Sequence, residues 1–173
     1  MSDSPDFAVK TLGIDTSLRS TGVAVVSAEG NRLSALEYGV IKNAPKVRLS
    51  ECLRNLDCGI SEIIARTNPV AVAIEGSFFS KNVKTSMILG QVRGVAIAAC
   101  ARNNIPVYEY APRRVKQAVV GFGSAGKVQV RGMVMKLLGI EKEPQEDEGD
   151  ALAIAICHLH NISGHAMLAP KEI

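Results

Sequence analysis

Residues 69–75 read PVAVAIE, a nearly continuous run of Val, Ala and Ile that ends on the carboxylate of Glu75. Such a run is typical of a strand that is buried on both faces, at the centre of a sheet. A second apolar run, VKTLGID, ends on Asp15, and the helical pattern EDEGDALAIAI begins with Asp147 and Asp150. Because strand ends and helix starts converge in an α/β domain, we expect these four acids to lie together.

The rest of the pattern predicts a mixed sheet with helices on both faces. Residues 9–15 and two runs within 20–42, separated by the turn sequence AEGN, favour an antiparallel meander of three strands. Two later strands, 69–75 and 106–112, alternate with helices and are expected to add in parallel, which gives five strands in a three-layer α/β fold. Helical patterns cover about 47–67, 84–103, 113–120, 128–140 and 146–160.

The composition fits one compact domain, residues 1–173, with an ordered core of about 9–160. The chain is 47% hydrophobic but has no Trp, so Val, Ile, Leu and Ala must form the core. The start, MSDSPDF, lacks the basic and apolar parts of a secretory signal. The most apolar stretch, GVAIAACA, is far shorter than the roughly 20 residues that span a membrane. We therefore expect a soluble cytoplasmic protein with no membrane partner.

The four cysteines form no C-x-x-C pair and lie in apolar helical patterns, so we expect reduced core residues. A zinc site made of Cys157, His158 and His160 is an alternative, although these residues lack the spacing of known zinc ligands.

Charge is unevenly distributed along the chain. From Lys81 to Lys136 there are ten Lys and Arg residues and one acid, Glu109, whereas residues 141–150 contain six acids and one base. A solvated helix face and an acidic loop would give the same pattern. A basic segment beside an acidic cluster also suits a nucleic acid bound around a metal ion.

The four acids suggest the chemistry of that metal site. Asp147 and Asp150 are three apart at a helix start and share a face, although acids in a first turn are also common helix caps. Glu75 ends an unbroken apolar strand, where a lone carboxylate is poorly solvated. Oxygen-only ligation favours Mg²⁺, with Mn²⁺ as a substitute, and two such ions are a standard arrangement for phosphodiester cleavage.

The segment 121–127, GFGSAGK, contains a G-x-G-x-x-G pattern and nearly matches a P-loop. Val128 stands where a P-loop has the Ser or Thr that holds Mg²⁺. We expect its glycines to let the backbone approach a DNA phosphate, with Lys127 assisting. Phe78 and Phe79 follow the 69–75 strand, and we expect one to pack under its loop and the other to contact bases.

Assembled in order, these motifs resemble the RuvC family of bacterial Holliday-junction resolvases over roughly residues 9–160. The matching blocks are LGID, STG, AIEGSFFSKN, LGQVRGVAI, VKQAVVGFGSAGKVQV and PQEDEGDALAIAI. The resemblance implies an RNase H-like fold, a homodimer, and Mg²⁺-dependent symmetric nicking of two like-polarity strands that leaves 5′-phosphate and 3′-hydroxyl ends. It also implies a role in recombination and repair with the RuvA–RuvB branch-migration complex. The family commonly has Pro-Gly where this chain has Thr16 and Ser17.

By motif position, the resemblance makes Asp15, Glu75, Asp147 and Asp150 the catalytic, metal-binding carboxylates. Lys116 and Lys127 match active-site cations, and Phe78 matches an aromatic residue that contacts bases near the cut. Further DNA contacts are expected from Phe79, Lys81, Lys84, Arg113, Arg114 and Arg131.

Two other functions are possible from the sequence alone. One is a junction-binding protein without catalysis, which four intact acids disfavour, since clustered carboxylates repel phosphate. The other is an actin- or sugar-kinase-like phosphotransferase, suggested by GIDTSLRSTG, although that class needs two domains and this chain is too short. For a symmetric dimer, the 84–103 helix is the expected interface, and Leu89→Asp is its test.

Overall fold

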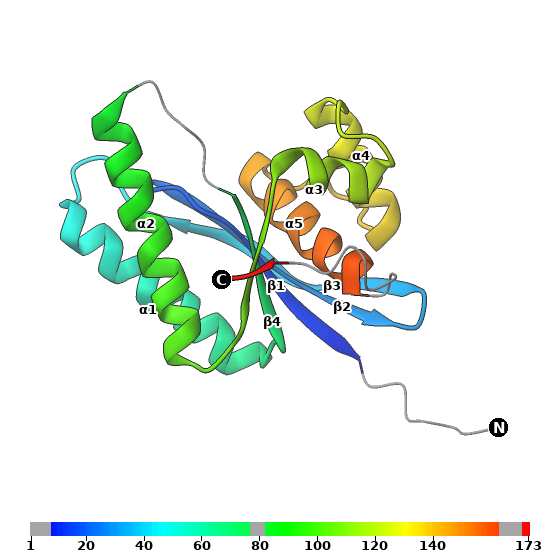
Figure 1. Cartoon of the computed structure of the whole chain (residues 1–173), viewed down its shortest axis with the longest axis horizontal. Coiled ribbons are helices and arrows are strands. Elements are labelled where there is room, and N and C mark those ends of the chain that lie inside the picture. Colours follow the sequence, from blue (N-terminus) through cyan, green and yellow to red (C-terminus); the bar gives the residue numbers. More distant parts are fainter. Residues whose placement is uncertain (1–7, 77–81, 163–170) are drawn as a thin grey trace.

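The computed structural model describes residues 8–76, 82–162 and 171–173, and its described strands form one mixed sheet in the order β3-β2-β1-β4-β5-β6 (Figure 1). The first three strands form the expected antiparallel meander. β4 adds parallel to β1, and β5 adds parallel to β4. The strands are β1 (Val9–Asp15), β2 (Ser20–Glu29), β3 (Arg32–Lys42), β4 (Ala71–Glu75), β5 (Val107–Tyr110) and β6 (Lys171–Glu172).

Helices cover both faces of this sheet, as predicted. Figure 1 shows α1 and α2 on one side and α3, α4 and α5 on the other. All five expected helices are present, with ends within two residues or so of the predicted ones. The helices are α1 (Leu49–Thr67), α2 (Val83–Arg102), α3 (Pro112–Val120), α4 (Lys127–Leu138) and α5 (Glu146–Ile162).

The prediction of five strands is wrong by one. The sixth, β6, pairs antiparallel with the edge of β5, where Glu172 faces Tyr108 and Lys171 faces Glu109. A strand of two residues is too short to carry an alternating pattern, so it has no signal in the sequence.

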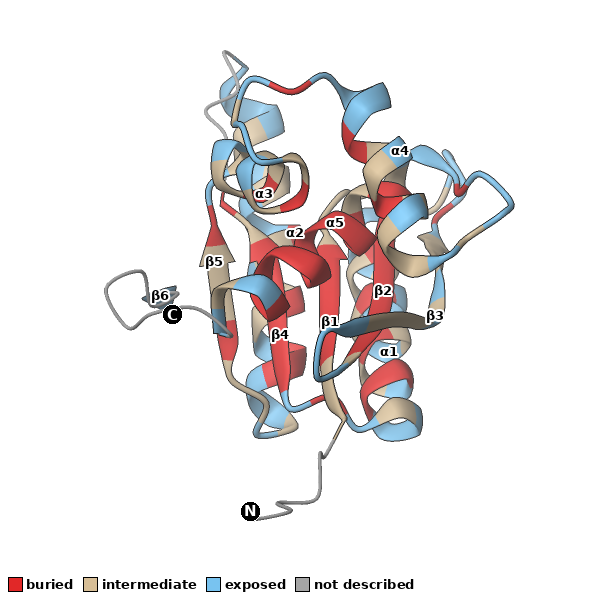
Figure 2. Cartoon of the chain, turned by 90° about the vertical axis from the view of Figure 1, so that its right-hand side faces the viewer, coloured by how far each residue is buried: buried red, intermediate tan, exposed pale blue. Residues whose placement is uncertain are grey.

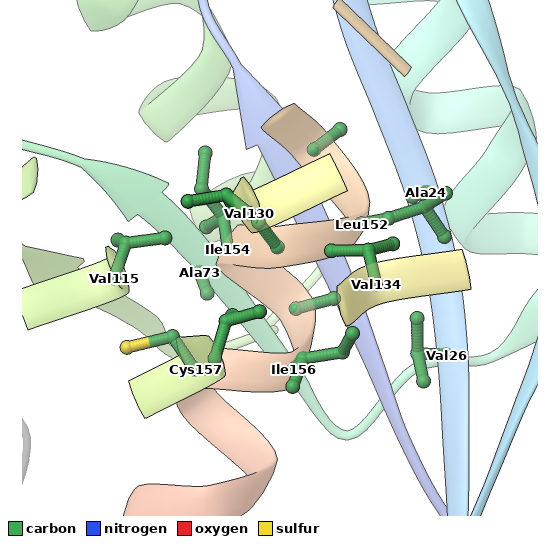
Figure 3. Close-up of a cluster of buried hydrophobic side chains, with 14 of the residues drawn as sticks. Ala24, Val26, Ala73, Val115, Val130, Val134, Leu152, Ile154, Ile156 and Cys157 are labelled. Carbon is green, nitrogen blue, oxygen red and sulfur yellow. The ribbon is translucent and has the colours of Figure 1, made fainter. Parts of the chain in front are cut away.

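Strand alternation divides the core into two parts. Leu12 and Ile14 of β1 pack with α1 and α2. Ala73 of β4 and Ala24 of β2 point the other way, into a cluster with α3, α4 and α5 (Figure 3). α5 is buried along most of its length (Figure 2), which explains why its pattern is apolar on nearly every side. Within the described parts of the chain, no helix is long and apolar enough to cross a membrane.

Candidate active site

Asp15 and Glu75 end adjacent parallel strands. In the register of β1 and β4, Ile14 lies opposite Ile74, so the two acids come next at the same edge of the sheet. Successive strand residues point to opposite faces. Asp15 therefore shares the face of Gly13, and Glu75 that of Ala73, which is the face that α5 covers. The sequence prediction that these two strand-end acids meet is confirmed.

Two glycines let α5 lie directly on the sheet. A Cβ at Gly13 would stand 2.1 Å from the carbonyl oxygen of Ala151, and one at Gly22 would stand 2.0 Å from that of Asp147. No other residue type fits where the helix backbone comes this close. The contact brings the start of α5, with Asp147 in its first turn and Asp150 one turn later, to the edge where β1 and β4 end.

A side-chain hydrogen bond also fixes Asp147. The Ser20 hydroxyl donates to Oδ2 of Asp147 across 127 positions of sequence. Ser20 lies on the same face of β2 as Gly22, so one strand positions both the backbone and the carboxylate of Asp147. Sequence analysis missed Ser20, although it begins the STG motif.

Burial and neighbouring acids raise the pKa of both strand-end acids. Burial, followed by the charges of Asp150 and Asp147, raises the pKa of Asp15 to about 6. Burial, followed by the charges of Asp15 and Asp150, raises the pKa of Glu75 to about 7. Burial also raises the pKa of Asp150. The site therefore concentrates negative charge in partly desolvated surroundings, where a bound cation would be strongly stabilised.

Two lysines face this charge. Lys116 of α3 and Lys127 of α4 line a pocket of about 340 Å³ together with Glu75 and Asp150, and its remaining wall is apolar. The positive charge of Lys127 lowers the pKa of Asp15, Glu75 and Asp150, against the stronger effect of burial. Lys127 Nζ lies 3.7 Å from Oδ2 of Asp150. Both lysines thus lie beside the acids, where the family resemblance places them.

Arg93 supports the end of β4. Its Nη1 donates to the backbone oxygen of Glu75 at 2.8 Å, and its guanidinium forms an ion pair with Glu109. The amide of Gly76 donates to the carbonyl oxygen of Tyr110 at 2.7 Å. Sequence analysis quoted Arg93 within a motif but gave it no role.

The remaining predicted DNA contacts are dispersed. Arg131, one turn after Lys127 on α4, forms an ion pair with Glu143. Lys84 is exposed in the first turn of α2, and Arg113 is exposed on α3. Arg114 is tied instead to Asn161 near the far end of α5, with Nε 3.1 Å from Oδ1. Phe78, Phe79 and Lys81 lie outside the described residues.

The glycines of 121–126 have structural roles. Gly121, with φ of 95°, ends α3 in the left-handed region, where a side chain would be strained. A Cβ at Gly123 would stand 2.2 Å from Cγ of Arg113. Gly126 begins α4, and its amide donates to Oε1 of Gln129 at 2.9 Å. Turn geometry between two helices therefore accounts for the pattern that resembles a P-loop.

The alternative zinc site is not formed. His158 is buried with Nδ1 2.8 Å from the Tyr110 hydroxyl, and His160 Nδ1 lies 2.9 Å from the carbonyl oxygen of Ala118. All four cysteines are free thiols, and burial raises the pKa of Cys157 to about 12. A protonated thiol is a poor zinc ligand.

The donors around the candidate site fit a hard divalent cation. They are carboxylate oxygens, which suit Mg²⁺ or Mn²⁺ rather than a softer metal. Across the described segments, no three Asp, Glu, Cys or His side chains are arranged to hold a metal ion by themselves. The acids thus supply the charge and the donor type, but not a complete coordination shell.

The fold and this carboxylate site define an RNase H-like nuclease. Comparison with known proteins identifies the family: the model of the crossover junction endodeoxyribonuclease RuvC matches residues 11–158, and the chain belongs to this family of metal-dependent nucleases. The RuvC of Geobacter sp. (strain M21) is 45% identical over 91% of this chain and 96% of its own length. The RuvC of Pelotomaculum thermopropionicum is 43% identical over 92% of this chain and 98% of its own length.

Solved structures agree with this assignment. Thermus thermophilus RuvC in complex with a Holliday junction substrate has a TM-score of 0.88 and 30% identity, and the alignment covers 95% of this chain and 99% of that one. The yeast mitochondrial Holliday junction resolvase Ydc2, at 15% identity and a TM-score of 0.63, shares the fold.

Proposed function

We propose that this chain resolves Holliday junctions by Mg²⁺-dependent nicking of two strands of like polarity, in recombination and repair. The observation that carries the proposal is the meeting of Asp15, Glu75 and α5 at one sheet edge, with Lys116 and Lys127 facing them. Family membership supports it, as does the similarity to a RuvC bound to a Holliday junction substrate. The raised pKa values of Asp15 and Glu75 also support it, because clustered and partly buried carboxylates are stabilised by positive charge.

In this proposal, Asp15, Glu75, Asp147 and Asp150 would hold two Mg²⁺ ions. Bound there, Mg²⁺ would supply Lewis-acid chemistry for phosphodiester hydrolysis, and the expected products have 5′-phosphate and 3′-hydroxyl ends. Ser20 holds Asp147 in position, and Arg93 holds the backbone of Glu75. Because the acids alone do not complete a shell, we expect DNA phosphate and water to supply further oxygens. Mn²⁺ should substitute.

Lys116 and Lys127 are proposed to neutralise charge on the pentacovalent phosphate. Both line the pocket beside Glu75 and Asp150. DNA contacts farther away are assigned to Lys84, Arg113 and Arg131, and also to Phe78, Phe79 and Lys81. Arg114 is a weaker candidate, since it bridges α3 to α5 through Asn161.

The direct test is cleavage of a synthetic four-way junction by the wild type and by Asp15→Asn, in Mg²⁺ and in EDTA. Paired, ligatable nicks that disappear in EDTA and in the variant are expected, with a loss of roughly 100-fold or more. Metal-dependent cleavage by Asp15→Asn at the wild-type rate would contradict the mechanism. Junction binding without cleavage in any metal would favour a non-catalytic binding protein, and ATP hydrolysis would favour the phosphotransferase.

Symmetric cuts need two sites related by a two-fold axis, so we propose a homodimer. An exposed and mostly apolar groove between α1 and α2, of about 670 Å³, is the proposed contact with the second copy; its lining residues are Leu49, Ser50, Leu53, Gln91, Gly94, Val95 and Ala98. This groove lies on the predicted interface helix. Leu89 is a poor probe of the interface because it lines a different hollow, with Asp15 and Glu75.

Ala98→Glu tests the interface better, because Ala98 is exposed in the single chain and lines the groove. We expect light scattering to show monomers for this variant. Ala65→Glu, at an exposed position of α1 outside the groove, is the matched control and should stay dimeric. A dimeric Ala98→Glu would place the interface elsewhere.

Two further parts of the proposal are a cytoplasmic location and cooperation with a RuvA–RuvB branch-migration complex. The four free thiols support a reducing compartment. Family membership supports the partnership, which co-purification with RuvB on junction DNA would test.

A further inference from the structure

Both basic residues on the site-facing side of α4 are paired with acids from one short segment. Lys127 forms an ion pair with Glu146, and Arg131 Nε lies 2.8 Å from Oε1 of Glu143. Lys127 and Arg131 are four residues apart and therefore share a helix face. Glu143 and Glu146 lie before and at the start of α5. The two ion pairs thus join the end of the acidic segment to the basic face of α4, beside the catalytic acids.

Three members of these pairs line a small hollow next to the site. Lys127, Arg131, Glu146 and Asp150 all line a space of about 110 Å³. Glu143 and Glu146 are equally exposed, at 61% of each side chain, so their carboxylates can leave without a cost of burial. Exposed pairs of this kind are weak, and a competing anion can replace one partner.

We propose that the carboxylates of Glu143 and Glu146 stand in for two DNA phosphates in the free enzyme, and that bound DNA displaces them from Arg131 and Lys127. This inference rests on the proposed function. A DNA phosphodiester, like a carboxylate, presents two oxygens that share one negative charge, and Arg and Lys form charge-assisted hydrogen bonds with both. Until DNA arrives, Glu146 also gives Lys127 a partner other than Asp150, whose oxygen it approaches to only 3.7 Å. Glu143 and Glu146 are therefore positioning residues that lower the affinity for DNA.

The test measures binding of a four-way junction by fluorescence anisotropy in EDTA. Glu146→Gln and Glu143→Gln should each tighten binding by about two- to fivefold, because each removes an acid that competes with DNA for a cation. The gain should shrink as salt increases, since exposed charges are screened. Glu141→Gln is the matched control: it removes one charge from the same exposed segment but touches neither cation, and it should change binding by less than the other two.

A double-mutant cycle separates action through Lys127 from a general change of charge. Glu146→Gln should have no effect beyond that of Glu141→Gln when Lys127→Met is already present. Equal effects of Glu146→Gln and Glu141→Gln, or an undiminished gain in the Lys127→Met background, would overturn the inference while junction cleavage by the wild type still upheld the proposed function. Failure of the wild type to bind the junction would overturn both.

Discussion

The two faces of the sheet are covered by helices in different ways. On one face, α1 and α2 pack through branched side chains, and Leu56, Ile60 and Val92 contact the strands in a cluster with Leu12 and Ile14. On the other face, α5 lies with its backbone against Gly13 and Gly22, at separations that exclude even a methyl group.

This difference indicates which helices must keep a precise position on the sheet. Branched side chains can repack after small changes, at modest cost. A backbone seated on glycine has no such freedom, so the position of α5 is fixed relative to β1 and β2. The candidate catalytic acids all lie on this second face or at its edge. The first face needs only to be stable, whereas the second must also hold Asp147 and Asp150 in place.

The largest effect is expected from adding a side chain where the backbone of α5 lies against the sheet. In Gly22→Ala, the new methyl group meets the backbone oxygen of Asp147, so the first turn of α5 must move. We expect a loss of roughly 1–3 kcal/mol in the free energy of unfolding. Since displacement of catalytic groups by about 1 Å can cost roughly 100-fold, cleavage of a four-way junction should fall by about that factor. Urea denaturation and single-turnover cleavage measure the two effects.

Ile60→Val on the opposite face is the matched control. Ile60 is fully buried between α1 and the sheet, so its loss of one methylene should cost about 0.5–1.5 kcal/mol. Cleavage should keep its wild-type rate, because no candidate site residue moves. If Gly22→Ala cleaves as well as Ile60→Val, the two faces do not differ in the way described.

The same contrast explains what the sequence could predict. Asp15 and Glu75 were found because an apolar run that ends in an acid is a local signal, and parallel pairing of β1 with β4 then brings the two ends together. The five helices likewise follow from local periodicity. The helical pair Asp147 and Asp150 was visible for the same reason.

Contacts between distant segments had no such signal. Ser20 meets Asp147 only because Gly22 lets α5 approach β2, and Arg93 meets the Glu75 backbone from a different helix. Glu146 was one acid among six in its segment, and nothing local distinguishes it as the partner of Lys127. The short β6 was equally invisible. Such residues can be identified only from the three-dimensional structure, because their partners are distant in the sequence.

A smaller effect, on stability, should distinguish the two faces by the ionisation of their acids. Burial and neighbouring acids raise the pKa of Asp15 from about 4 to about 6, so the folded chain binds this proton more tightly than the unfolded chain does. The stability of the metal-free protein should therefore fall as pH rises from about 4 to 6 on account of this group, and the deficit should persist above pH 6. Asp15→Asn cannot ionise and should be more stable than the wild type at pH 7.5 in EDTA, by roughly 1–2 kcal/mol. The gain should vanish near pH 4, and urea denaturation at the two pH values measures it. Asp57→Asn, on α1, removes a half-buried carboxylate that pairs with the exposed Arg102 at 2.7 Å, so the same chemical change there should leave stability equal or slightly lower at pH 7.5. Stability changes of opposite sign in the two variants would show that the clustered acids on the α5 face destabilise the metal-free protein. Changes of the same sign would show that the two faces do not differ in this respect.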